Sequence, residues 1–115
     1  MAISEAFAGS ASISTTEYDL PSASTTLSSQ TSDGIFQLFL DLNALAAGDE
    51  YQLRIYEKTR STSTQRLVDE TLLVGIQPEP VFVTPALVLL HGWTMTLKKL
   101  AGTDRTIEWS IRSVA

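Results

Sequence analysis

The sequence predicts an all-β protein, a β-sandwich of jelly-roll type with about eight short antiparallel strands. Apolar and polar residues alternate with a period of two in several short segments. Turn residues separate these segments at intervals of roughly 8–12 residues. No segment shows a convincing helical period, and the length of 115 residues suits one domain.

Composition divides the chain at about residue 33. Residues 1–33 hold fourteen Ser and Thr and few large apolar side chains. Such a segment buries little surface, so we expect an extended, loosely held N-terminal arm over residues 1–33. Within this arm, residues 13–20 are predicted to form one edge strand that Pro21 ends. Residues 34–115 are predicted to form the sandwich domain.

The strands of the sandwich domain follow from alternation or from short β-branched and apolar runs. Predicted strands cover residues 36–42, 51–56, 65–74, 81–83, 87–90, 93–98 and 107–112. The continuous apolar run 87–90 is typical of a strand covered on both faces. Residues 101–104 contain Gly102 and predict a hairpin loop.

Charge and cysteine content limit the partners. The formal net charge is −5, and the eight basic residues are scattered without forming a stripe. Because DNA and anionic lipid repel an acidic surface, we expect no nucleic-acid partner and no membrane partner. The absence of cysteine excludes disulfides and thiolate metal sites and fits synthesis in a reducing cytoplasm. Residues 1–20 do not resemble a signal peptide.

Groups that carry catalysis do not form a recognisable set. The single histidine, His91, lies beside Gly92 and is interpreted as a structural turn residue. Asp69 and Glu70 are adjacent on a predicted strand, so their side chains point to opposite faces. No phosphate-binding glycine motif and no GxSxG motif is present. We therefore predict that the protein is not an enzyme and uses no cofactor and no metal.

The aromatic residues indicate the core and an interface. Trp93 and Trp109 lie on apolar faces of alternating strands, which favours a core position over a sugar-binding role. Phe39 and Tyr56 lie on the opposite faces of their strands and are candidates for exposed contacts. The arm is either a frayed tail or an extended segment that adds a strand to a neighbouring subunit. The predicted protein-interface residues are Ile13, Tyr18, Leu20, Phe39 and Tyr56.

Three segments carry a resemblance to a known class of proteins. They are Ile-Ser-Thr-Thr-Glu-Tyr-Asp-Leu at 13–20, Tyr-Gln-Leu-Arg-Ile-Tyr-Glu-Lys at 51–58, and residues 93–109 with Trp at each end. In these segments the chain resembles small virion structural proteins of tailed bacteriophages, of the capsid cement or decoration type.

The resemblance implies a jelly-roll-like protein, made in the host cytoplasm, that binds the outer surface of the assembled capsid. Its implied partners are the major capsid protein and further copies of itself, as a dimer or trimer. Two other hypotheses stay open. One is a tail- or fibre-associated binding module, with glycans among its ligands, and the other is an enzyme whose pocket joins His91 to a carboxylate.

Overall fold

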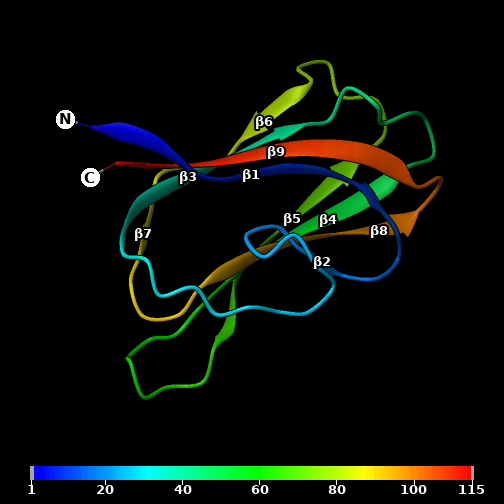
Figure 1. Ribbon diagram of the computed structural model, residues 1–115. Coiled ribbons are helices and arrows are strands. Elements are labelled where there is room, and N and C mark those ends of the chain that lie inside the picture. Colours follow the sequence, from blue (N-terminus) through cyan, green and yellow to red (C-terminus); the bar gives the residue numbers. More distant parts are fainter. Residues whose placement is uncertain (1, 115) are drawn as a thin grey trace.

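Two antiparallel sheets face each other in the computed structural model, which describes residues 2–114 (Figure 1). The first sheet, sheet A, has the order β1-β9-β3-β6, and β7 also pairs with β3. Sheet B has the order β2-β8-β4-β5. The strands of sheet A are β1 (Ile3–Ile13), β3 (Gly34–Asp41), β6 (Val81–Val83), β7 (Leu87–Leu89) and β9 (Arg105–Val114). Those of sheet B are β2 (Tyr18–Asp19), β4 (Glu50–Glu57), β5 (Arg66–Val74) and β8 (Thr94–Ala101).

This arrangement confirms the prediction of an all-β sandwich. Within residues 2–114 the structure contains nine strands and no helix. Accordingly, no helix in that range is long and apolar enough to cross a membrane.

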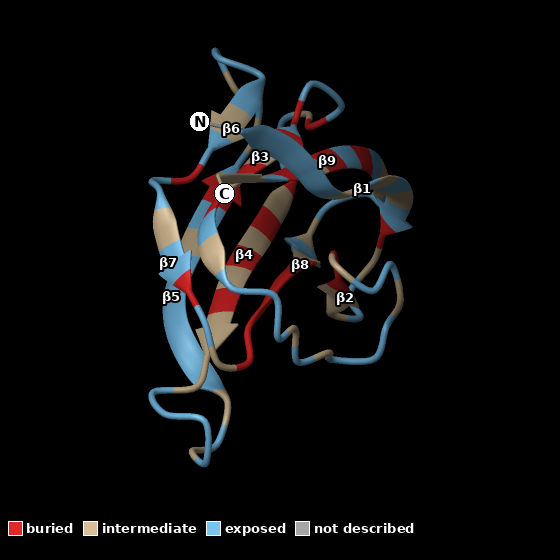
Figure 2. Ribbon diagram, turned by 60° about the vertical axis from the view of Figure 1, so that its left-hand side comes forward, coloured by how far each residue is buried: buried red, intermediate tan, exposed pale blue. Residues whose placement is uncertain are grey.

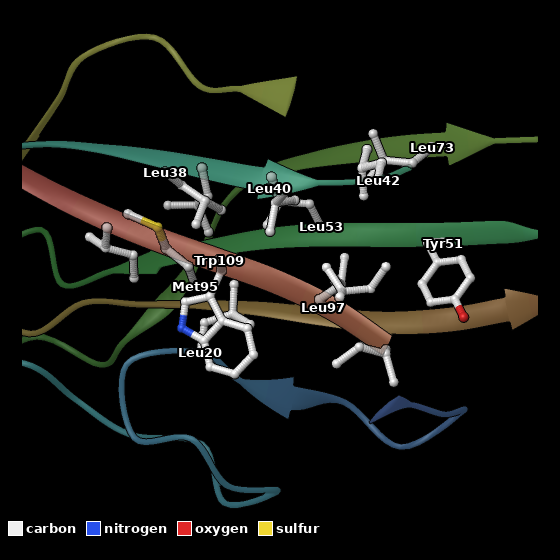
Figure 3. Close-up of a cluster of buried hydrophobic side chains, with 14 of the residues drawn as sticks. Leu20, Leu38, Leu40, Leu42, Tyr51, Leu53, Leu73, Met95, Leu97 and Trp109 are labelled. Carbon is white, nitrogen blue, oxygen red and sulfur yellow. The ribbon is translucent and has the colours of Figure 1, made fainter. Parts of the chain in front are cut away.

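The core lies between the inner faces of the two sheets. Alternate side chains of β3, β4, β8 and β9 point inward, because successive residues of a strand face opposite sides. Figure 3 shows leucines of β3 and β4 meeting Met95 and Leu97 of β8. The alternating burial along β4 is visible as banding in Figure 2. The strand periodicity of the sequence is therefore the pattern of core burial.

Both tryptophans belong to this core, as predicted. Trp93 is fully buried, and its ring contacts those of Phe7 and Phe36 with centroids 5.9 and 4.6 Å away. Its Nε1–H donates to the carbonyl of Ser32 at 2.7 Å, so the polar edge of the indole is satisfied. Trp109 is 4% exposed and packs edge-on against Tyr18.

The N-terminal segment differs from the predicted arm. β1 pairs with β9 along its whole length, from Ile3 opposite Val114 to Ile13 opposite Arg105. Residues 3–13 are therefore part of the sandwich and not of a separate arm, and Ile13 is fully buried. The small residues that indicated looseness allow close packing instead. At Gly9, an added Cβ would lie 2.5 Å from the Trp109 ring.

Serine and threonine hydroxyls fix the segment after β1 as well. The Asp19 carboxylate is 1% exposed and accepts hydrogen bonds from the backbone and hydroxyl groups of Ser22 and Ser28. Thr94 of β8 donates a further bond to it at 2.6 Å. These hydrogen bonds fasten residues 22–28 to Asp19 of β2 and to Thr94 of β8. A segment that is poor in apolar residues is thereby ordered through a buried carboxylate.

Three local predictions are wrong. The predicted strand 13–20 is divided, because β1 ends at Ile13 and β2 spans only Tyr18–Asp19. The run 87–90 is not covered on both faces, since Val88 is 80% exposed. Residues 101–104 do not close a hairpin, because β8 and β9 belong to different sheets.

The close approach of β1 to Trp109 gives a test of the N-terminal packing. We expect Gly9→Ala to lower the free energy of unfolding by about 1–3 kcal/mol, because the methyl group overpacks the indole ring. Urea denaturation of both proteins measures the change. Ser10→Ala, at the exposed neighbouring position, is the matched control and should be nearly neutral. Equal stability of Gly9→Ala and wild type would show that β1 is held loosely.

Candidate interaction surface

Exposed apolar side chains gather on one border of the sandwich. Thirteen large apolar residues are exposed in the described part of the chain, and nine of these lie between residues 67 and 90. We call this set the apolar edge: Leu67, Val68, Leu72, Val74, Ile76, Val81, Val83, Val88 and Leu90. Leu72 and Val74 lie on the outer face of sheet B, whereas Val81, Val83 and Val88 pair with outward residues of β3 and lie on the outer face of sheet A. The set therefore lies at the same end of both sheets without forming one continuous face, and exposed apolar groups of this size are candidates for interaction sites.

Sheet topology explains the exposure. β5 is the last strand of sheet B and is paired by β4 alone, while β6 and β7 end sheet A beyond β3. Figure 2 shows β5 and β7 along the left-hand border and β6 at the top, with β5 exposed over most of its length. Only Leu73 of β5 is buried. The apolar edge therefore combines the open borders of both sheets.

The side chains of β5 are accessible on the outer face of sheet B. Leu72 lies opposite Gln52 of β4, and Val74 lies opposite Glu50. These partners point away from the core, so Leu72 and Val74 do also. Their exposed fractions are 56% and 55%. Among residues 2–114, no strand packs over these two side chains.

Two polar anchors hold the ends of this edge. Burial alone would raise the pKa of the Glu57 carboxyl, but backbone N–H groups outweigh that effect and lower the pKa. The donors include Leu90 at 2.7 Å and Gly92 at 2.9 Å. The segment that follows β7, including the His91 turn, is thus fastened to the end of β4.

The second anchor is Asp49, which precedes β4. Its carboxylate accepts the N–H groups of Thr103 and Ala46, both at 2.9 Å, and the Nε–H of Arg105 at 2.8 Å. These bonds, led by that of Thr103, lower the pKa of Asp49 to about 2. Its carbonyl accepts the N–H of Gly75 at 2.8 Å, which fixes the end of β5. Asp49 therefore connects the loop between β8 and β9 to the end of β5 through hydrogen bonds.

Tyr51 reinforces the same corner. Its hydroxyl donates to the carbonyl of Thr103 and accepts the N–H of Arg105, both at 2.8 Å. Gly102 is required here, because its φ is +93° and an added Cβ would collide with Asp49. The ring of Tyr51 is buried, and burial raises the pKa of its hydroxyl.

Two of the five predicted interface residues are core residues. Ile13 is fully buried and Leu20 is 1% exposed, so neither side chain is available to a partner in the folded chain. Both belong to the cluster between the sheets, because β1 and β2 are parts of the sandwich. Tyr18 is half-buried against Trp109.

Phe39 lies on the outer face of sheet A. The guanidinium of Arg112 stacks on its ring, with Cζ 3.8 Å from the centroid. Beside it, an open groove of about 360 Å³ runs along β1, β9 and β3 and includes Glu5 and Glu108.

Tyr56 lies on the outer face of sheet B, so the structure does not bring it together with Phe39. Its hydroxyl donates to Glu17 Oε2 at 2.6 Å. Burial, followed by this bond to Glu17, raises the pKa of Tyr56. Both Phe39 and Tyr56 are half-buried by contacts within the chain.

Neither metal-binding geometry nor a relative assigns a function to these surfaces. In residues 2–114, no three His, Asp or Glu side chains are placed so as to hold a metal ion. Comparison with protein-family models, curated proteins and solved structures finds no match to the chain.

The Asp49 anchor gives a pH-dependent prediction. A native pKa of about 2, below the ordinary 3.8, means that ionised Asp49 stabilises the fold above pH 3.8. That contribution is lost as the pH falls toward 2. We expect Asp49→Asn to be less stable than wild type at pH 7, with a difference that shrinks between about pH 4 and pH 2.

Chemical denaturation across this pH range measures the difference, and Glu108→Gln, at an exposed carboxyl, is the control. A difference in unfolding free energy that stays constant with pH would contradict the assigned role of Asp49.

Proposed function

We propose that this chain is a non-catalytic structural protein of a bacteriophage virion, of the capsid cement or decoration type. It binds the outer surface of the assembled capsid and stabilises the shell. The apolar edge is the observation that carries the proposal, because a surface of this kind is stable in water when another protein covers it. The capsid as the partner follows from the resemblance in residues 13–20, 51–58 and 93–109.

We also infer the connectivity of a jelly roll. Without the short β7, eight strands remain, and β8 and β9 are the seventh and eighth of them. Sheet A then has the strand order 1-8-3-6, and sheet B has the order 2-7-4-5. This order supports two interlocked Greek keys, which is the jelly-roll arrangement of viral capsid and lectin domains. β7 is an additional short strand beside β3.

The energetics of a lattice suit such a role. A protein that binds the assembled shell, and not its free subunits, stabilises the shell by mass action. Many copies on a symmetric lattice gain further through multivalency when they are joined to one another. We assign the capsid contact to the β6–β7 part of the apolar edge, where Val88 is the most exposed large apolar residue.

The alternative of a glycan-binding tail or fibre module rested on exposed tryptophans. Trp93 is fully buried and Trp109 is 4% exposed, so neither presents its ring to a sugar. No specific observation now favours that alternative over the capsid role.

Co-sedimentation with capsids tests the proposal. Purified protein is mixed with capsids of its own phage that were prepared without it, and binding and the temperature of shell rupture are measured. We expect saturable binding and a higher rupture temperature. Val88→Asp should weaken binding at least about tenfold, because a carboxylate is then desolvated at the contact.

Leu100→Asp, at another exposed apolar position of a strand outside the apolar edge, is the matched control and should bind as wild type does. Absence of binding by the wild-type protein would discard the cement role. Wild-type affinity of Val88→Asp would remove the β6–β7 region from the contact.

A further inference from the structure

β5 has a long free border at one end of sheet B. Natural edge strands are kept short, charged or covered, because an exposed row of N–H and C=O groups attracts further strands. β5 is nine residues long, and within residues 2–114 it pairs with β4 alone. β6 and β7 have three residues each, and β2 has two. β1, the other long edge strand, has eleven residues but exposes mainly small and polar side chains, whereas β5 exposes Leu67, Val68, Leu72 and Val74.

The direction of the free backbone groups on β5 follows from one hydrogen bond. The N–H of Gly75 donates to the carbonyl of Asp49, in line with the β4–β5 register. In an antiparallel pair, alternate residues direct both backbone groups toward the same neighbour. The backbone groups of Thr71 and Leu73 therefore point toward β4, and those of Glu70, Leu72 and Val74 point toward the open side.

The two halves of β5 differ in how well they can accept another strand. The N-terminal half carries Arg66, Asp69 and Glu70 and is interrupted by a register shift at Val68. Bulges and charges of this kind hinder edge pairing. The C-terminal half is regular and continues into an uncharged stretch over residues 71–78. The net charge of −5 makes two copies repel each other, but residues 71–78 contain no charged side chain and so add nothing to that repulsion.

We propose that a second copy of this chain pairs antiparallel with residues 70–74 of β5 about a two-fold axis at Leu72. The two copies of sheet B then form one continuous sheet. Leu72 lies opposite Leu72 of the second copy, and Glu70 lies opposite Val74. The backbone groups of Glu70, Leu72 and Val74 supply about six hydrogen bonds between the copies, with the side chain of Gln77 giving up its present bond to the Val74 carbonyl. This inference rests on the proposed use of the apolar edge as an interface and names the occupant of its β5 part.

The register follows from charge. An axis at Glu70 would place two carboxylates directly opposite each other, which destabilises a strand pair. An axis at Leu72 places no like charges opposite each other; it sets Leu72 against its counterpart on the outer face and Val74 against Glu70. A two-fold contact requires a surface that is complementary to itself, and the uncharged, regular half of β5 meets that requirement.

Measuring the mass of the purified protein in solution, without capsids, tests the pairing. We expect light scattering after size exclusion to give twice the chain mass at micromolar concentration. Leu72→Lys places two ammonium groups together at the axis and should yield monomers, with a dissociation constant raised at least about 100-fold. Leu72 is exposed, so circular dichroism should show an intact fold. Leu100→Lys, at an exposed position on β8, should remain dimeric.

Cross-linking tests the register. The chain has no cysteine, so Leu72→Cys introduces a single thiol that meets its own copy across the axis. Opposite residues of a strand pair lie within disulfide distance, and mild oxidation should give a covalent dimer. Leu100→Cys should stay largely uncross-linked.

Two results would overturn the inference. One is a monomeric wild-type protein, and the other is a dimer that Leu72→Lys leaves intact. A monomer that still binds capsids would contradict the strand pairing but not the cement proposal. A dimer that does not bind capsids would contradict the cement proposal but not the strand pairing.

Discussion

The packing of β9 against the inner face of sheet B is the interaction on which the rest of the structure depends. β9 pairs with β1 on one side and with β3 on the other. Its inward residues Ile107, Trp109 and Ile111 are buried between the sheets. Because Trp109 lies against Gly9, this packing also places β1. The N-terminal segment is ordered through the central strand and contributes Ile13 to the core.

The same sandwich leaves exposed apolar residues on the border formed by β5, β6 and β7. Polar anchors at Asp49 and Glu57 fasten the chain at the ends of β5 and β7, so the open border is held in a defined shape. A loop or tail with this many exposed apolar residues would be expected to collapse onto the core. Held on strands, those residues remain available to other subunits. This combination of a rigid border and uncovered apolar surface is what the proposed virion role requires.

Sequence periodicity was sufficient for the fold class and for the core positions of Trp93 and Trp109, because alternation directly reflects burial in strands. It was misleading for the N-terminal segment. A segment rich in Ser and Thr and poor in large apolar side chains indicates looseness, yet here Gly9 lets β1 pack closely on Trp109, and Ser22 and Ser28 bond to Asp19. The apolar edge could not be recognised in advance, since the apolar residues of 65–74 and 81–90 look the same in a central strand and in an edge strand. Only the sheet order distinguishes the two.

Hydrogen–deuterium exchange at single-residue resolution tests the central claim, that the border formed by β5 is covered by protein in the working state. The amides of Leu72 and Val74 point away from β4 and have no hydrogen-bond acceptor among residues 2–114 of the same chain. We expect the amides of Leu72 and Val74 to exchange slowly at high protein concentration and faster on dilution. The amides of β4 should stay protected at every concentration. Rapid exchange of Leu72 and Val74 at every concentration, and also in capsid-bound protein, would contradict the central claim.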